Sequence, residues 1–292
     1  MAEKFSKGIY DCPVLSNTEV ARGIFLMRLH APEIAAGVQP GQFVNVTVNA
    51  NGSDHIFPLL RRPFSVCQAH REAGWISILW KAIGPGTRLL TRRRPGNVLN
   101  LIGPLGKGYQ LPQEKREVFL VGGGLGVAPL PLLAEAFHAH GISFEVMLGA
   151  RTAAELWGHQ EFQPRSGKIH LADGRAKTHL AIATDDGSAG HHGFVTEILA
   201  ARLRKNPSGK SPAQIYACGP MPMLQRVAAI CREAQAPAQI AVETMMGCGF
   251  GICMGCPVAP ARGVAEFGRY LLACVDGPVF HADEICYESF AH

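Results

Sequence analysis

The sequence has few charged residues and no long hydrophobic run, and both absences narrow the class of protein. Charged residues make up 17% of the 292 residues and hydrophobic residues 47%, whereas soluble domains are usually about 25% charged. No apolar run approaches the roughly 18 residues that a membrane helix needs, and the N-terminus leads into no hydrophobic signal core. We therefore expect a cytoplasmic globular protein that is long enough for more than one domain.

The chain also lacks the features of a nucleic-acid-binding protein. Its formal net charge is only +5, and its densest basic cluster consists of Arg88, Arg92, Arg93 and Arg94. No aromatic residues stand between these arginines, whereas nucleic-acid-binding surfaces commonly combine basic with aromatic side chains. The cluster is more typical of a solvated helix face.

The cysteines do not form a disulfide framework. Of nine cysteines, five have no regular spacing, and we expect them to be ordinary buried thiols. These five are Cys12, Cys67, Cys218, Cys231 and Cys286.

The other four cysteines are the most informative feature of the chain, and they are Cys248, Cys253, Cys256 and Cys274. Four residues separate the first two, two separate the next two, and seventeen precede the last. This spacing is that of plant-type ferredoxins, which bind a [2Fe–2S] cluster. Four thiolates suit two irons, because each iron shares two bridging sulfides and needs two protein sulfurs. Glycines at 247, 249, 251 and 255 fit a loop that wraps closely around a cluster.

A structural zinc site is the main alternative for these cysteines, because zinc also takes four thiolates in a tetrahedron. Zinc ribbons usually show two short Cys-x2-Cys pairs, whereas here three cysteines share one Gly-rich loop. A disulfide is a further alternative, although structural disulfides are rare in cytosolic proteins. The pattern favours iron–sulfur, and a zinc-stabilised nucleotide sensor without enzymatic activity stays open as a different class of function.

The N-terminal part reads as short strands separated by turns. Its apolar runs are broken by Pro40-Gly41, Gly84-Pro85-Gly86 and Pro95-Gly96, which favours an antiparallel β-barrel. One short helix is expected after Gly86, capped by Thr87. The predicted strands cover residues 23–30, 42–48, 64–68, 75–81 and 97–102.

Beyond a polar stretch at residues 110–117, strands alternate with helices, which predicts a parallel sheet with helices on both faces. Strands are expected at 118–121, 143–148, 169–172, 214–218 and 239–242, and helices at 128–140, 153–162, 194–205 and 222–234. The predicted division is a barrel domain at 1–112, an α/β nucleotide-binding domain at 113–243 and a small cysteine-bearing domain at 244–292.

Two loops of the α/β part are candidates for a nucleotide site. Gly122-Gly123-Gly124-Leu125-Gly126 lies between a predicted strand and a predicted helix, where bare amides can accept a pyrophosphate. It is not the dinucleotide fingerprint, because Val127 stands where the third Gly or Ala belongs. The second loop, Cys218-Gly219-Pro220-Met221, ends a later strand, and ligands of open α/β sheets bind at such ends.

Two stretches of the barrel are candidates for a phosphate-bearing ligand. Arg61-Arg62-Pro63-Phe64-Ser65 places a guanidinium, an aromatic ring and a hydroxyl along one strand. Gly84-Pro85-Gly86-Thr87 opens the short helix and offers a second anion site. Two such stretches in one barrel suggest a ligand with two phosphates.

In this order, the barrel motif Arg-x-Phe-Ser, the Gly-Thr turn, the Gly-rich loop and Cys-Gly-Pro are similar to ferredoxin–NADP reductase-type flavoproteins. With the C-terminal cysteine motif added, the whole chain resembles the electron-transfer subunits of NAD-dependent (type 1B) dihydroorotate dehydrogenases. Residues 183–188, 193–196 and 276–280 also resemble that family. The segment from 156 to 181 and the loop between Cys256 and Cys274 are somewhat longer than its pattern.

The resemblance implies cofactors and the residues that bind them. FAD would be bound by Arg62, Pro63, Phe64, Ser65, Leu79, Trp80, Lys81, Gly86 and Thr87. NAD(H) would be bound by Gly122, Gly123, Gly124, Gly126, Cys218, Gly219, Pro220 and Met221, with Arg151 placed to meet a 2′-phosphate if the cofactor were NADP. The cluster would be bound by Cys248, Cys253, Cys256 and Cys274.

The resemblance also implies a function and a partner. In that family, electrons pass from dihydroorotate through FMN on a separate catalytic subunit to the cluster, then to FAD and NAD⁺, in pyrimidine (UMP) biosynthesis. This chain would supply the sites of the cluster, FAD and NAD⁺ in a heterotetramer with two copies of each subunit. It carries no residues assigned to dihydroorotate oxidation. A related diaphorase subunit, as in a sulfhydrogenase or an NADH-dependent ferredoxin:NADP oxidoreductase, is the nearest alternative.

Overall fold

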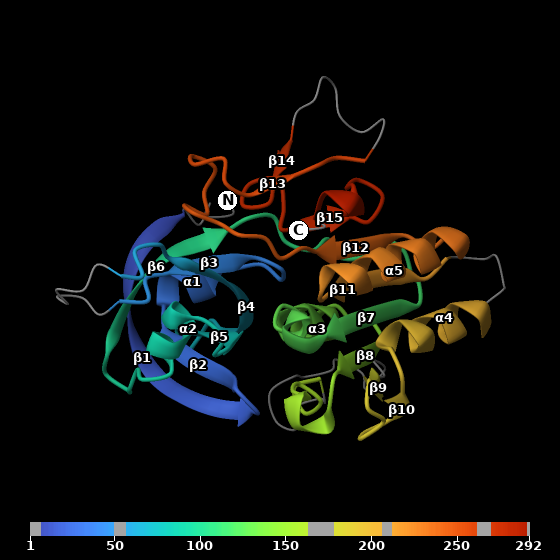
Figure 1. Cartoon of the computed structure of the whole chain (residues 1–292), viewed down its shortest axis with the longest axis horizontal. Coiled ribbons are helices and arrows are strands. Elements are labelled where there is room, and N and C mark those ends of the chain that lie inside the picture. Colours follow the sequence, from blue (N-terminus) through green and yellow to red (C-terminus); the bar gives the residue numbers. More distant parts are fainter. Residues whose placement is uncertain (1–6, 50–56, 163–177, 206–211, 262–269, 291–292) are drawn as a thin grey trace.

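The computed structural model describes residues 7–49, 57–162, 178–205, 212–261 and 270–290. A closed barrel lies on the left of Figure 1, a sheet with its helices on the right, and short C-terminal strands above their junction. Among the described residues, no helix combines the length and the apolar character that crossing a membrane would require.

The barrel has six antiparallel strands, which confirms the predicted fold of this part. A strand that the sequence analysis missed, β1 (Gly8–Ala21), closes it by pairing with β6 through residues 8–13 and with β2 from residue 14 onward. Around the barrel, the order is β1, β2 (Ile24–His30), β5 (Trp75–Lys81), β4 (Arg62–His70), β3 (Phe43–Val46) and β6 (Val98–Leu105).

Apolar side chains fill the barrel. Met27, Leu29, Ile76 and Ile78 are buried from alternate positions of β2 and β5, as expected where one face of each strand points inward. Two helices accompany the strands, α1 (Pro32–Gly37) and the predicted α2 (Pro85–Leu90).

The second part is a seven-stranded sheet. Its first six strands are parallel and β15 pairs with β12 in the antiparallel direction. The strand order is β10 (His191–His192), β9 (Thr178–Thr184), β8 (Phe144–Ala150), β7 (Val118–Gly123), β11 (Gln214–Cys218), β12 (Ala238–Ala241) and β15 (Val279–His281).

Helices cover both faces of this sheet, as predicted. In β7, Leu120 belongs to a core shared with α3 (Leu130–Ala139) and with barrel residues such as Leu79. Its neighbour Val121 belongs to the opposite core, shared with α4 (Val195–Lys205) and α5 (Met221–Glu233). The alternation follows from the two-residue period of a strand, and it places α3 on the side that faces the barrel.

The C-terminal part is attached to the sheet rather than separate from it. Strands β13 (Pro257–Val258) and β14 (Leu271–Leu272) form a small antiparallel pair, and the chain then returns as β15 to the edge of the large sheet. Cys256 and Cys274 flank this pair and are buried in the core shared with α4 and α5. The last described element is the turn η3 (Tyr287–Phe290).

One predicted helix is wrong. Residues 153–162 contain only the single 3₁₀ turn η2 (Ala153–Glu155), after which Leu156 is extended and Gly158 adopts a φ of +97°. Such a φ is incompatible with helix continuation, and it lets both Trp157 and Phe162 bury their rings in the core beside α3.

Other differences concern where elements lie. The expected helix at 128–140 begins at Leu130, after the 3₁₀ turn η1 (Gly124–Val127). Strand β9 was not predicted at its position. The expected strand at 169–172 lies outside the described residues.

Candidate functional site

The four cysteines of the C-terminal motif stand as two pairs. Cys248 and Cys253 face each other across the loop, and the backbone N–H of each lies 3.4 Å from the sulfur of the other. Cys256 and Cys274 meet sulfur to sulfur at 3.2 Å. All nine cysteines of the chain are free thiols, which excludes the disulfide alternative for this motif in the structure.

Backbone amides of the loop are directed at the sulfurs. Burial alone raises the pKa of Cys248, but N–H groups from Cys253, Phe250 and Ile252 outweigh it and lower that pKa to about 6. The pKa of Cys274 is raised to about 12 by burial and by the adjacent Cys256 thiol. A cysteine binds a metal as a thiolate. The loop favours this ionisation at Cys248, whereas the buried pair, Cys256 and Cys274, would lose its protons only when the metal binds.

The donor set fits a binuclear cluster. Each iron of a [2Fe–2S] cluster takes two thiolates, and the structure provides two pairs: Cys248 with Cys253 inside the Gly-rich loop, and Cys256 at its end with Cys274 from beyond β14. Among the described residues, no three His, Cys, Asp or Glu side chains converge on one point as ligands of a single metal ion would. The pairs differ in burial: Cys248 is half-buried and Cys253 exposed, whereas Cys256 and Cys274 are both buried.

The cysteine loop is bound to the barrel. Asn45 of β3 donates from Nδ2 to the carbonyl oxygen of Cys248 over 2.7 Å. A second junction lies at the base of the loop, where the N–H of Lys107 donates to Gly277 O over 2.5 Å and the N–H of Val242 donates to Pro278 O over 3.0 Å. Barrel, sheet and cysteine loop therefore meet at one place.

In the barrel, the two predicted phosphate-binding stretches come together. A Cβ atom placed on Gly86 of α2 would lie 3.5 Å from Nε of Arg62, the first residue of β4. The start of β4 therefore adjoins α2. Among the described residues, the side chain of Arg62 bonds only to nearby backbone, at Leu60 O and Arg61 O, so it can turn to an anion. Thr87 uses its hydroxyl to accept from the N–H groups of Ile83 and Gly84, which shapes this turn.

The neighbouring Arg61 has a structural role. Its guanidinium bonds to the carbonyl oxygens of Asn45 and Asn100 and to the Asn100 side chain, and burial lowers its pKa. These bonds join β3 to β6 at the end of the barrel. In the part of the chain that the structure describes, Arg61 is therefore committed to these strands, whereas Arg62 bonds only to the backbone of Leu60 and Arg61.

The outer face of β4 and β5 is turned toward the sheet domain. Phe64 and Trp80 pack into the barrel core, so by alternation Ser65 and Leu79 point outward, and Leu79 contacts residues of the sheet domain. Helix α3 contacts β4, and η1 contacts β5. Of the predicted FAD residues, Ser65 and Leu79 lie on the side of the barrel turned toward the sheet domain, whereas Phe64 and Trp80 pack into the barrel core.

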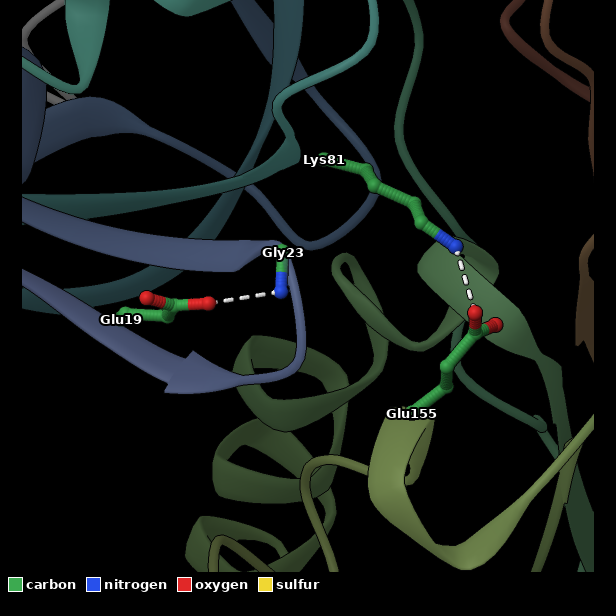
Figure 2. Close-up of polar contacts among 4 residues, drawn as sticks. All are labelled: Glu19, Gly23, Lys81 and Glu155. Carbon is green, nitrogen blue, oxygen red and sulfur yellow. Dashed lines mark hydrogen bonds and ion pairs between the residues drawn. The ribbon is translucent and has the colours of Figure 1, made fainter.

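Lys81, the last residue of β5, links the two domains. Its Nζ lies 2.9 Å from Oε1 of Glu155 in η2, as Figure 2 shows, while Glu19 accepts from the N–H of Gly23 at the β1–β2 turn nearby. Gln68 adds a second link, donating to Oε2 of Glu161 over 2.5 Å. The Lys81–Glu155 pair is partly exposed, so it contributes no more than about 0.2–1 kcal/mol to the free energy of unfolding.

The two candidate nucleotide loops lie side by side. Strands β7 and β11 are neighbours in parallel register, with Cys218 opposite Gly122. The strand order reverses between them, since β8 to β10 continue on one side and β12 on the other. This is the switch point at which open α/β sheets bind ligands.

Glycine is required where these loops pack against each other. A Cβ on Gly126 would overlap the carbonyl oxygen of Cys218, and one on Gly123 would lie 3.2 Å from Cδ of Pro220. Gly124 differs: its φ is +55° and nothing lies within 4 Å of a Cβ placed there. The loops thus form a closely packed base with an open side at Gly124.

Glu243 is a charged residue of this region that the sequence analysis did not single out. It follows β12 at the end of the sheet, and desolvation by the surrounding protein raises its pKa. Burial, and then the charge of Glu243, raise the pKa of the Cys218 thiol well above its usual value. The only sequence signal was an acidic residue directly after the predicted strand at 239–242, five positions before Cys248.

Comparison with known proteins agrees with this geometry. Family models match residues 11–109 (oxidoreductase FAD-binding domain), 120–229 (oxidoreductase NAD-binding domain) and 243–286 (iron-sulfur cluster binding domain of dihydroorotate dehydrogenase B). The electron transfer subunit of dihydroorotate dehydrogenase B (NAD(+)) from Desulforamulus reducens is 33% identical, over 96% of this chain and 99% of its own length. The chain belongs to this family.

Other relatives support the same placement. The corresponding subunit from Geobacillus kaustophilus is 36% identical, over 93% of this chain and 96% of its own. In three dimensions, a chain of the NADH-dependent reduced ferredoxin–NADP oxidoreductase superposes with a TM-score of 0.75 at 26% identity, covering 97% of this chain and 92% of that one. The chain therefore has FAD-binding, NAD-binding and iron–sulfur domains, and its curated relatives favour this family over the diaphorase alternative.

Proposed function

We propose that this chain transfers electrons between a [2Fe–2S] cluster, FAD and NAD(H), and that it accepts them from a separate subunit that oxidises dihydroorotate. The observation that carries the proposal is the junction of the three parts: β3 of the barrel is bound to the cysteine loop, while the outer face of β4 and β5 meets the sheet domain. Its assignment to pyrimidine biosynthesis rests on the family.

The barrel residues would hold FAD. Arg62 would bind its phosphates with a charge-assisted hydrogen bond, beside the turn formed by Gly86 and Thr87. Ser65 would present its hydroxyl to the flavin from the outward face of β4. The remaining predicted contacts are those of Pro63, Phe64, Leu79, Trp80 and Lys81.

The loops at the switch point would hold the nicotinamide nucleotide. Gly124, on the open side, would let the backbone approach the pyrophosphate, and the close packing of Gly126 on Cys218 would fix the two loops relative to each other. The predicted set is Gly122, Gly123, Gly124, Gly126, Cys218, Gly219, Pro220 and Met221. We propose NAD rather than NADP, because the backbone N–H groups of Asp185 and Asp186 donate to Ala150 O and Arg151 O. Two acidic residues thus adjoin Arg151, and their negative charge would disfavour a 2′-phosphate.

Cys248 and Cys253 would bind one iron, and Cys256 and Cys274 the other. Nicotinamide exchanges a hydride whereas the cluster carries one electron at a time, so the flavin supplies the chemistry that joins single electrons into pairs. The N–H groups around Cys248 would stabilise negative charge on the sulfurs and raise the reduction potential of the cluster.

A catalytic partner follows from family membership, and the surface at the cysteine loop supports a docking site there. Ile252 is 77% exposed and Met254 60% exposed, and Phe250 and Tyr270 are exposed nearby. Exposed apolar side chains around a redox centre are typical of a protein interface. We propose an FMN-containing partner and a heterotetramer with two copies of each subunit.

The proposed overall reaction is balanced across the two subunits. Oxidation of dihydroorotate to orotate releases two electrons and two protons. Reduction of NAD⁺ takes up both electrons and one proton as a hydride, and the second proton is released to solvent. This chain alone is expected to catalyse only the NAD-linked half.

A visible spectrum of the anaerobically purified chain, with iron, sulfide and zinc quantified on the same sample, tests the proposal. We expect flavin bands on a broad cluster absorption, two irons and two sulfides per chain, and bleaching by NADH. A colourless chain that holds zinc contradicts it. Co-expression with the partner should then yield dihydroorotate:NAD⁺ activity, whereas capture of a different redox partner would favour the diaphorase alternative.

Arg62→Ala should weaken FAD binding by about 1.5–3 kcal/mol, the usual contribution of a hydrogen bond to a charged group. Flavin titration of the apoprotein, followed by fluorescence quenching, measures this. Lys107→Ala is the matched control. It also removes a cation, but at the base of the cysteine loop, where Nζ lies 4.0 Å from Asp276, and not at the candidate phosphate site. Equal flavin affinity in Arg62→Ala and the parent chain would remove Arg62 from the site.

A further inference from the structure

Asn45 occupies the contact between the barrel and the cysteine loop. Its side chain is fully buried, and Nδ2 donates to the carbonyl oxygen of Cys248 over 2.7 Å. On β3, Asn45 pairs with Pro63 of β4, the strand that carries the predicted flavin residues. One side chain thus connects that strand pair to the backbone of a cluster ligand.

The loop rests directly on this amide. Gly249, the residue after Cys248, has a φ of +85°, and a Cβ on it would lie 2.7 Å from Nδ2 of Asn45. Any other residue at 249 would both adopt a strained backbone and push the loop away from β3. The glycine therefore allows the closest approach of the cysteine loop to the barrel at this point.

The other half of the amide shows that packing alone does not explain Asn45. Its Oδ1 is buried and has no hydrogen-bond partner among the described residues. A leucine of similar size would avoid the free-energy penalty of an unpaired buried oxygen. An amide at this position is favoured only if its donor, directed at Cys248, has a role of its own.

We propose that Asn45 is a positioning residue for electron transfer: its hydrogen bond fixes Cys248, and with it the cluster, at a set separation from the flavin-bearing strands. The inference rests on the proposed function. Residues that orient metal ligands from outside the ligand set typically change metal affinity or activity about 10–100-fold when replaced. Because Asn45 holds the ligand's backbone, its loss should affect both the position and the electronic environment of the cluster.

The test compares Asn45→Leu with the parent chain, both carrying FAD and cluster. Stopped-flow reduction by NADH separates bleaching of the flavin from the later reduction of the cluster. In Asn45→Leu, we expect flavin bleaching at the parent rate and cluster reduction slowed about 10–100-fold. Release of the Cys248 backbone should also weaken the N–H···S contact between Cys248 and Cys253, which would shift the cluster's reduction potential to more negative values and change its EPR spectrum.

Asn17→Leu is the matched control. Asn17 is another barrel asparagine whose buried Oδ1 has no partner within the described part of the chain, but its Nδ2 donates to Leu90 O and Arg93 O, at the far end of α2. Its replacement should lower the melting temperature without changing the cluster's potential or EPR spectrum. If Asn45→Leu does not fold with a cluster, Asn45→Ser serves instead, because it removes the long amide without adding bulk.

The outcomes are distinct. Parent-like cluster reduction, potential and EPR spectrum in Asn45→Leu, or in Asn45→Ser, would overturn the role of Asn45 and leave the proposed function intact. Changes equal to those of Asn17→Leu would show a merely structural residue and overturn it as well. A parent chain without two irons and two sulfides would instead refute the proposed function itself.

Discussion

Cys253→Ala should abolish assembly of the cluster and leave FAD bound. Cys253 is the exposed member of the four cysteines, so its removal leaves the hydrophobic cores unchanged, whereas Cys256 and Cys274 are part of one. Without it, one iron lacks a thiolate, and the N–H groups of Cys248 and Gly255 lose the sulfur they face. The barrel has a core of its own, so its flavin-binding residues should remain in place.

Iron, sulfide and flavin contents of the purified variant measure this effect. We expect loss of both irons and both sulfides, near-parent flavin content, and NADH–ferricyanide activity close to that of the parent chain. Cys286→Ala is the matched control, because this half-buried cysteine of the same region has its sulfur 3.1 Å from Glu288 and lies outside the motif. Loss of flavin from a folded Cys253→Ala chain would show that the two sites are not independent.

The cluster motif could be predicted from sequence because its information is local. Three of its four ligands lie within nine residues, and the glycines between them predict a tight loop. The division of the four sulfurs into two pairs agrees with the prediction of two irons. Which cysteines form a pair became clear only from the structure, because the chain passes through β14 before Cys274 meets Cys256. The order of barrel, α/β sheet and cysteine domain was readable for the same reason, from changes of periodicity along the chain.

What the sequence did not reveal depends on contacts between distant residues. Strand β1 was missed because it pairs with β6 in its first half and β2 in its second, so no single buried face runs along its 14 residues. The helix expected at 153–162 failed because Trp157 and Phe162 are buried by a turn at Gly158 rather than by helical spacing. In each case, tertiary packing decided the local conformation.

The roles of individual polar residues were equally hidden. Arg61 and Arg62 are adjacent and identical in type, yet the first is bound to Asn45 and Asn100 across the barrel, whereas the second adjoins Gly86 of the candidate phosphate site. Asn45 itself, 203 residues from Cys248, carries no local signal. Long-range hydrogen bonds of this kind can be found only once the strands are placed.

Gly126→Ala should strongly weaken binding of NAD(H) while leaving FAD and the cluster in place. Gly126 does not adopt a positive φ, so the effect is steric. A methyl group there would overlap the carbonyl oxygen of Cys218 and press on Gly219, which forces apart the two loops at the switch point. Overpacking of this kind typically costs about 1–3 kcal/mol, and here the displaced atoms belong to the proposed nucleotide site, so we expect at least a tenfold rise in the Kd for NADH.

Gly141→Ala provides the control for this experiment. Gly141 follows α3 in the same domain, and it has a φ of +66° with nothing within 4 Å of a Cβ. Alanine there introduces about 1–2 kcal/mol of backbone strain without steric overlap, so it should lower the melting temperature and leave the Kd for NADH unchanged. Isothermal titration with NADH and thermal unfolding of both variants separate the two effects. If both lower the melting temperature and neither changes NADH binding, the packed loops of β7 and β11 are not the nucleotide site, and the ligand must be sought elsewhere along the sheet edge.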